Sequence, residues 1–274
     1  MKNSRRHALG QHFLRDANIL NRIAAAVQVV PGETVLEIGA GKGPLTAALA
    51  ASGARVVAVE MDPPLAVELA KKEIPGLTIV EGDILDLDWP ALMKEHGAPA
   101  GPFAVAGNLP YSISSPILFR VVDLKDVISR AVFLVQREMA ERIIAGPGSK
   151  DYAPLGILLQ IHFEAKILFR LHPGSFIPPP KVESAVLALI KREHPLVDLK
   201  DEAGFRKFLF AAFAQRRKTL SNNLAAAGYA NESIAATVSS LGLDPRIRAE
   251  QIPPPLLAML ESAFGRNNNV DYGI

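Results

Sequence analysis

The stretch that decides the fold is residues 35–44, which read VLEIGAGKGP. Its apolar, β-branched start is typical of a buried strand, and LTAALA at residues 45–50 has the composition of a helix. Glycines between a strand and a helix are needed where the backbone takes positive φ or touches a ligand. The stretch therefore predicts a strand, a glycine turn and a helix N-terminus in a doubly wound α/β fold.

Similar short runs recur through the first two thirds of the chain and alternate with stretches rich in alanine and leucine. This alternation is typical of a mostly parallel sheet with crossover helices. Two later runs, residues 166–169 and 185–190, predict a closing hairpin, because no long helix need lie between them. The other predicted strands are residues 56–60, 77–80, 103–106 and 131–135.

After Arg192 the pattern changes to helices only, predicted over residues 205–224, 234–241 and 255–264. The sequence KREHP at residues 191–195 is typical of a linker. We therefore expect a first domain over residues 1–192 and a small all-helical domain over residues 193–274.

The composition sets outer limits on the function. The 274 residues are 49% apolar, enough for one large core or two unequal ones, and the absence of cysteine excludes disulfides, thiolate metal sites and cysteine nucleophiles. The six histidines have no metal-ligand spacing, so we expect no metal. There is no apolar signal region and no run of about 18 uncharged apolar residues, so we expect a cytoplasmic protein without membrane association.

The glycine loop favours a nucleoside ligand without phosphates. Glu60 ends the next predicted strand, 21 residues after Gly39, where an acidic side chain can hold both hydroxyls of a ribose. Pro44 takes the place of the last glycine in a dinucleotide fingerprint, and Lys42 is not followed by the serine or threonine of a phosphate loop. The preceding Glu37 suits a cationic nucleoside such as S-adenosyl-L-methionine (S-adenosylmethionine). A turn that binds nothing and a nicotinamide oxidoreductase are the alternatives.

Charge is segregated along the chain, although the formal total is only +2. Residues 26–100 carry 5 basic and 11 acidic groups, which suits a cationic ligand, whereas residues 1–25 carry 5 basic groups and 1 acidic group. Asp83, at the end of the third predicted strand, has the chemistry to accept a hydrogen bond from an adenine amino group. A plain turn or cap residue is the alternative for Asp83.

The sequence NLPY follows the fourth predicted strand, at the sheet edge where doubly wound folds bind ligands. The amide oxygen of Asn108 and a main-chain oxygen of Leu109 or Pro110 can accept both hydrogens of an adenine amine, so that its lone pair faces a methyl donor. Tyr111 offers a face for base stacking, worth about 1–3 kcal/mol, and the proline stiffens the turn. An Asn-x-Pro turn with a packed tyrosine is the alternative.

Five strings together resemble the rRNA adenine dimethyltransferases, most closely their bacterial KsgA/RsmA type. They are GQHFL at residues 10–14, EIGAG at 37–41, NLPY at 108–111, FIPPPKV at 176–182 and QRRKT at 215–219. The resemblance covers nearly the whole chain, with the strings in order. Ala40 departs from the proline of many relatives, which affects the stiffness of the turn rather than the ligand.

The resemblance implies a Rossmann-like class I S-adenosylmethionine-dependent methyltransferase that dimethylates N6 of two adjacent adenosines in the 3′-terminal hairpin loop of 16S rRNA during small-subunit biogenesis. By motif match, the target base is held by Asn108, Leu109, Pro110, Tyr111 and Phe176, with Tyr111 and Phe176 on its two faces. The implied cofactor contacts are His12 and Leu14 at the entrance, Gly39 at the methionine part, Gly41 in the same glycine loop, Glu60 at the ribose, Asp83 at the adenine and Asn108 near the methyl group.

The expected partner is the small ribosomal subunit precursor, bound by a monomer. Residues 215–218 place three cations within one predicted helical turn, and with Arg5, Arg6 and Arg15 they can hold RNA phosphates. A solvated helix face is the alternative for the 215–218 cluster. Two other functions stay open: an Erm-type methyltransferase of large-subunit rRNA, and a non-catalytic RNA-binding assembly factor of the same fold.

Overall fold

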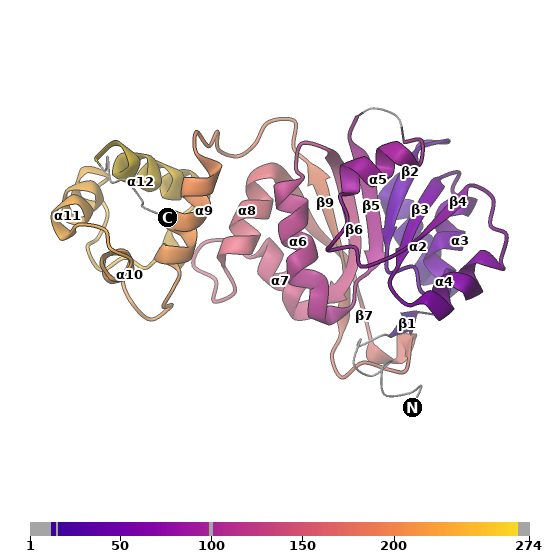
Figure 1. Cartoon of the computed structure of the whole chain (residues 1–274). Coiled ribbons are helices and arrows are strands. Elements are labelled where there is room, and N and C mark those ends of the chain that lie inside the picture. Colours follow the sequence, from indigo (N-terminus) through magenta and orange to yellow (C-terminus); the bar gives the residue numbers. More distant parts are fainter. Residues whose placement is uncertain (1–11, 15, 99–100, 268–274) are drawn as a thin grey trace. The chain divides into compact units, whose positions relative to one another are not determined.

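The computed structural model describes residues 12–14, 16–98 and 101–267. The chain forms two compact units (Figure 1). The first contains the described residues up to Glu141 together with Phe163–Arg192, and the second contains Arg142–His162 and the described residues from Glu193 onward. Each unit is described by itself below.

The first unit is built on a seven-stranded sheet in the order β4-β3-β2-β5-β6-β9-β7. The five strands β4, β3, β2, β5 and β6 pair with their neighbours in parallel, and β9 pairs antiparallel with both β6 and β7. This arrangement confirms the predicted mostly parallel sheet with a closing hairpin. The strands are β2 (Thr34–Ile38), β3 (Arg55–Glu60), β4 (Leu77–Glu81), β5 (Phe103–Asn108), β6 (Ile128–Gln136), β7 (Phe163–Leu171) and β9 (Ser184–Lys191).

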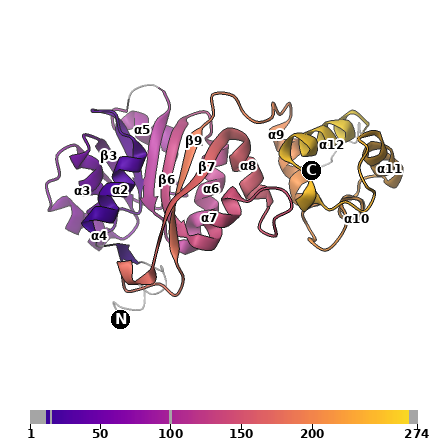
Figure 2. The same ribbon diagram turned by 180° about the vertical axis from the view of Figure 1, so that it is seen from behind.

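Helices cover both faces of the sheet: α6 lies in front of it in Figure 1, and α2 lies in front of it in the reverse view of Figure 2. Residues of β2, β5 and β6 are almost entirely buried, as expected of parallel strands covered on both sides. A short ribbon of β1 (Phe13–Leu14) and β8 (Phe176–Ile177) stands apart from the main sheet. The helices are α2 (Ala17–Val27), α3 (Pro44–Ala51), α4 (Pro63–Ala70), α5 (Trp89–Glu95) and α6 (Ser114–Asp123), with short 3-10 turns η1 (Tyr111–Ile113) and η2 (Pro173–Ser175). The boundary between the units falls within α7 (Arg137–Ile144), after Glu141.

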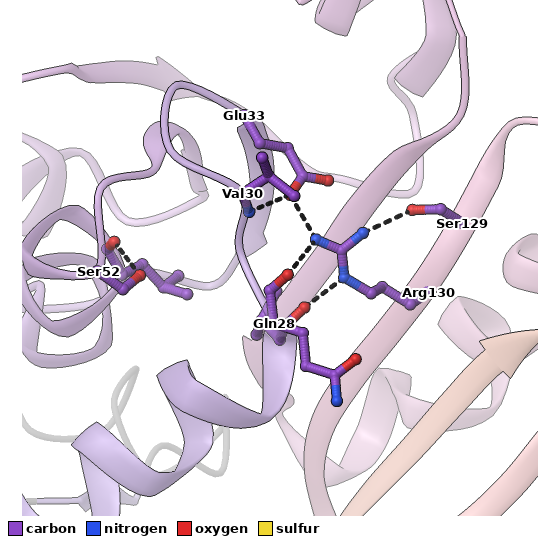
Figure 3. Close-up of polar contacts among 8 residues, drawn as sticks. Gln28, Val30, Glu33, Ser52, Ser129 and Arg130 are labelled. Carbon is purple, nitrogen blue, oxygen red and sulfur yellow. Dashed lines mark hydrogen bonds and ion pairs between the residues drawn. The ribbon is translucent and has the colours of Figure 1, made fainter.

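The C-terminal end of α2 is fastened to β6 by Arg130 (Figure 3). The Arg130 guanidinium donates hydrogen bonds to the main-chain oxygens of Val27 and Gln28 and pairs with the Glu33 carboxylate. Glu33 also accepts a hydrogen bond from the Val30 N–H at 3.0 Å. Arg130 thus satisfies carbonyls that the end of a helix leaves without partners, and it holds α2 against the sheet.

The second unit is a helical assembly with an aromatic core. Rings of Phe205, Phe208, Tyr229 and Phe264 lie within 5.3–6.5 Å of one another, centroid to centroid, in four contacting pairs. The helices are α8 (Pro154–His162), α9 (Glu202–Ala212), α10 (Leu220–Ala226), α11 (Asn231–Ser240) and α12 (Pro254–Asn267), with the 3-10 turn η3 (Ala249–Gln251).

The units differ from the expected division in one respect. Residues 142–162 were expected in the first domain, yet they group with the C-terminal helices. The Tyr152 hydroxyl donates to the main-chain oxygen of Ile252 at 3.1 Å, and α8 packs on α9. The break near Arg192 coincides with the expected linker.

The prediction of one helix over residues 205–224 is wrong. The chain forms α9 and α10 there, because Phe213 ends the first helix and the Thr219 side chain caps the second by accepting a hydrogen bond from the Asn222 N–H at 3.2 Å. Arg216, Arg217 and Lys218 therefore lie in the connecting turn, not on one helical turn.

Candidate active site

A cavity opens where the carboxyl ends of β2, β3, β4 and β5 meet. It lies beside the point where the strand order reverses, between β2 and β5, which is where doubly wound sheets bind ligands. Ten of the eleven residues predicted for the site line this cavity. They are His12, Leu14, Gly39, Gly41, Glu60, Asp83, Asn108, Leu109, Pro110 and Tyr111.

Phe176 is the residue that the structure does not bring to the cavity. Its side chain is 2% exposed and belongs to the apolar core, and in the ribbon it pairs with Leu14. A contact between Phe176 and a base requires β8 to move from this position.

The glycine loop and Glu60 form one wall. Gly39 and Gly41 take φ values of 70° and 58°, which favour glycine, and the Gly41 N–H donates to Glu60 Oε2 at 2.7 Å. Glu60 Oε1 accepts a second hydrogen bond from the Asp62 N–H at 2.8 Å. The carboxylate is thus held in one orientation, and each oxygen keeps acceptor capacity for a ribose hydroxyl.

Glu37 lies at the floor of the cavity and is 1% exposed. Burial raises its pKa to about 7; the Thr46 side chain acts against this shift, and the charge of Glu60 adds to it. Glu37 Oε2 makes no hydrogen bond to a described residue. A cationic ligand would supply a partner for this Glu37 Oε2 atom.

Asp83 adopts the turn geometry that was the alternative for it, since its Oδ1 accepts a hydrogen bond from the Leu85 N–H at 2.9 Å. It lines the cavity all the same, beside Met61 and Ile84. The sequence reasoning missed these two apolar residues. Each directly follows an acidic residue at a strand end, and that position was the available signal.

Asn108 has a defined amide orientation. Its Nδ2 donates a hydrogen bond to the main-chain oxygen of His12 at 2.9 Å, so Oδ1, which has no hydrogen bond to a described residue, is the acceptor that faces a ligand. The preceding Gly107 was also missed. A Cβ on Gly107 would lie 2.7 Å from the main-chain oxygen of Ile38, so only glycine lets β5 approach β2 this closely.

Tyr111 begins η1 at the rim of the same cavity. Its hydroxyl forms a hydrogen bond with the Ser184 hydroxyl at 2.9 Å, and its ring centroid lies 5.6 Å from that of His12. Burial raises the pKa of the Tyr111 phenol, and the Ser184 contact acts against this shift. His12 Nδ1 in turn donates to the main-chain oxygen of Pro178 at 2.8 Å.

The cations expected at the N-terminus, Arg5, Arg6 and Arg15, lie outside the described residues, as do Gly10 and Gln11. Within the part of the chain that the structure describes, no three acidic or histidine side chains group as metal ligands, and no helix is long and apolar enough to span a membrane.

Comparison with known proteins decides the family. The family profile described as ribosomal RNA adenine dimethylase matches residues 2–260. The chain belongs to this family. Two relatives named ribosomal RNA small subunit methyltransferase A support the assignment. The one from Geobacter sulfurreducens is 46% identical over 90% of each chain, and the one from Myxococcus xanthus is 43% identical over 95% of this chain and 91% of its own.

The fold of this chain is also similar to solved structures of methyltransferases. A dimethyladenosine transferase from Plasmodium falciparum has a TM-score of 0.79 at 24% identity, covering 93% of this chain and 98% of its own. The 23S rRNA methyltransferase ErmE has a TM-score of 0.68 at 27% identity, covering 92% of this chain and 99% of its own. The predicted resemblance and the predicted methyltransferase fold are thereby confirmed.

Proposed function

We propose that the chain dimethylates N6 of two adjacent adenosines in the 3′-terminal hairpin loop of 16S rRNA, with S-adenosylmethionine as methyl donor. The observation that carries the proposal is the amide of Asn108, whose oxygen is left free to accept a hydrogen bond at the cavity. Family membership and the small-subunit relatives at 43–46% identity supply the substrate.

The residues around the glycine loop fit the cofactor. Glu60 would accept hydrogen bonds from the ribose hydroxyls and Asp83 one from the adenine amino group, while Met61 and Ile84 would contact the adenine ring. Glu37 lines the same cavity with a buried oxygen that has no hydrogen bond to a described residue, so its charge would balance that of a cationic ligand. When bound there, S-adenosylmethionine supplies an electrophilic methyl group.

The target amine is oriented by hydrogen-bond acceptors, and no general base is needed to activate it. Asn108 Oδ1 takes one N–H, and Leu109 O is favoured for the other, because Pro110 O already accepts hydrogen bonds from Ile113 N–H and the Ser114 hydroxyl, both at 3.1 Å. Held in this way, the nitrogen lone pair points toward the methyl carbon, and alignment of this kind lowers the barrier. As the N–C bond forms and the S–C bond breaks, the extra proton on N6 passes to water.

The target base stacks on Tyr111 after it leaves the RNA helix. Phe176 stays a proposal for the opposite face, and it needs a shift of the β1–β8 ribbon. Arg216, Arg217 and Lys218 are proposed to contact RNA phosphates from their turn, so that the helical domain of residues 193–274 binds RNA. We further propose a monomer that acts in the cytoplasm and needs no metal for transfer to a neutral amine.

Primer extension on rRNA from a deletion strain tests this function. We expect loss of the block at the small-subunit terminal hairpin, restored by the wild-type chain and not by Asn108→Ala, with RNA binding largely kept by the variant. A block lost from large-subunit rRNA would instead support the Erm-type activity that the similarity to ErmE suggests. Restoration of the cellular phenotype by Asn108→Ala would favour a non-catalytic assembly factor.

A further inference from the structure

We propose that Ser184 is a positioning residue for methyl transfer, because its buried hydroxyl fixes the ring of Tyr111 on which the target base stacks. The inference rests on the proposed function and deepens it. Ser184 is not among the residues that line the cavity, so it acts only through Tyr111, whose hydroxyl lies 2.9 Å from the Ser184 Oγ.

Ser184 is itself fixed by the sheet. It begins β9 with no exposed surface, and it pairs with Gln136 of β6 on one side and Leu171 of β7 on the other. The neighbouring residue, Glu183, is also held in place by contacts with Arg137. The Arg137 N–H donates to the Glu183 main-chain oxygen at 2.9 Å, and the Arg137 guanidinium pairs with the Glu183 carboxylate at 2.7 Å. The serine oxygen therefore occupies a place set by three strands.

Tyr111 is held at both of its ends. Its main chain follows Pro110, whose φ is restricted, and the Pro110 oxygen accepts the hydrogen bonds from Ile113 and Ser114 that close η1. The hydroxyl bond to Ser184 fixes the far end, so the ring cannot swing about χ1 without breaking it. A half-buried tyrosine without this bond would sample other rotamers, and a stacked base would follow the ring.

Dimethylation makes the position of the ring more demanding. The second transfer acts on an N-methyl amine, which is bulkier and has only one N–H left for the acceptors around Asn108. A ring displaced by a fraction of an ångström should therefore impair the second transfer more than the first. Loss of the Ser184 hydroxyl is expected to raise the share of monomethyladenosine among the products.

The test compares Ser184→Ala, Tyr111→Phe and the double variant on unmethylated small subunits. Each single variant should lower kcat about 3- to 10-fold, the range for one lost hydrogen bond, with the KM for the subunit nearly unchanged. The double variant should be no worse than the single ones, because both changes remove the same bond. Ser52→Ala is the control. It removes the bond from the Ser52 hydroxyl to Leu49 O at 2.6 Å (Figure 3). Neither residue lines the cavity, so kcat and the product ratio should stay at wild-type values.

Wild-type kcat and product ratio in Ser184→Ala, or additive losses in the double variant, would overturn the inference. RNA carrying 2-aminopurine at the target position gives a second readout that does not depend on methylation. Stacking on Tyr111 should quench its fluorescence in the wild-type chain and quench it less in Ser184→Ala. Equal quenching would again reject the role of Ser184. Absence of methyl transfer by the wild-type chain would count against the proposed function instead.

Discussion

The side-chain nitrogen of Asn108 lies 2.9 Å from the main-chain oxygen of His12, a residue 96 positions earlier in the chain. Only the nitrogen of an amide can donate, so this contact decides which end of the side chain is left for a ligand. The segment before α2 thus sets the chemistry at the end of β5.

The substitution Asn108→Asp tests the donor role of the amide nitrogen separately from the acceptor role of the oxygen. The variant keeps an acceptor for the adenine amine but can no longer donate to the His12 oxygen, and two acceptors facing each other will rotate the side chain away. We expect methyl transfer to fall by roughly 100-fold, the cost of a misplaced positioning group. Single-turnover transfer from labelled cofactor measures it. Asn21→Asp, which makes the same change on an exposed face of α2, should transfer methyl groups at the wild-type rate. Equal losses of transfer in the two variants would show that the bond from Asn108 to the His12 oxygen has no role.

Cofactor affinity should depend on pH through Glu37. With a pKa of about 7, this carboxyl is mostly protonated at pH 6 and mostly ionised at pH 8, and only the ionised form attracts a cation. Affinity should therefore rise about tenfold from pH 6 to pH 8, in proportion to the ionised fraction. Calorimetry at the two pH values measures it. Glu37→Gln should bind more weakly at pH 8 and should lack this part of the pH dependence; an identical pH profile in the variant would exclude Glu37 as its source.

Gly107→Ala tests the close approach of β5 to β2. The added Cβ would meet the Ile38 main-chain oxygen at 2.7 Å, so the strands must separate and carry Asn108 with them. We expect a loss of about 1–3 kcal/mol in unfolding free energy, typical of overpacking, together with a lower kcat. Denaturant unfolding and transfer assays measure the two. Gly174→Ala has open space around its Cβ and should change neither; matching stabilities of the two variants would refute the packing argument.

Arg130→Ala should reduce stability more than chemistry. Arg130 is the shared partner of two helix-terminal oxygens and of Glu33, and its side chain is only 14% exposed. We expect a loss of about 2–3 kcal/mol in unfolding free energy, with kcat kept at temperatures where the variant is folded. Thermal unfolding followed by circular dichroism gives the comparison. Lys166→Ala removes an ion pair in which both side chains are at least half exposed, and should leave the unfolding free energy nearly unchanged. An equally small effect of Arg130→Ala would mean that the fastening of α2 is redundant.

Sequence patterns predicted the sheet and most of the cavity because both depend on local signals. A strand followed by a glycine turn, and NLPY at a strand end, each fix a short stretch whose position at the sheet edge follows from topology. The sequence did not show that Phe176 packs in the core, because the apolar neighbours that cover it come from distant parts of the chain. Ser184 was invisible for the same reason: its partner is 73 positions away.

The break between α9 and α10 is a different case, since its signal was present. Thr219 is a good N-cap residue, and the cap it forms with the Asn222 N–H begins a new helix. Five polar residues, QRRKT at residues 215–219, also interrupt the apolar pattern at this point. The cap at Thr219 and the polar stretch before it together mark the start of a separate helix.

The most direct test of the central claim is to map where the purified protein places methyl groups. Unmethylated small subunits would be incubated with labelled S-adenosylmethionine, and the label located along the rRNA at nucleotide resolution. We expect label in two adjacent adenosines of the 3′-terminal hairpin loop, with dimethyladenosine as the end product. Label elsewhere in the rRNA, or no transfer by a folded chain that binds the cofactor, would contradict the account.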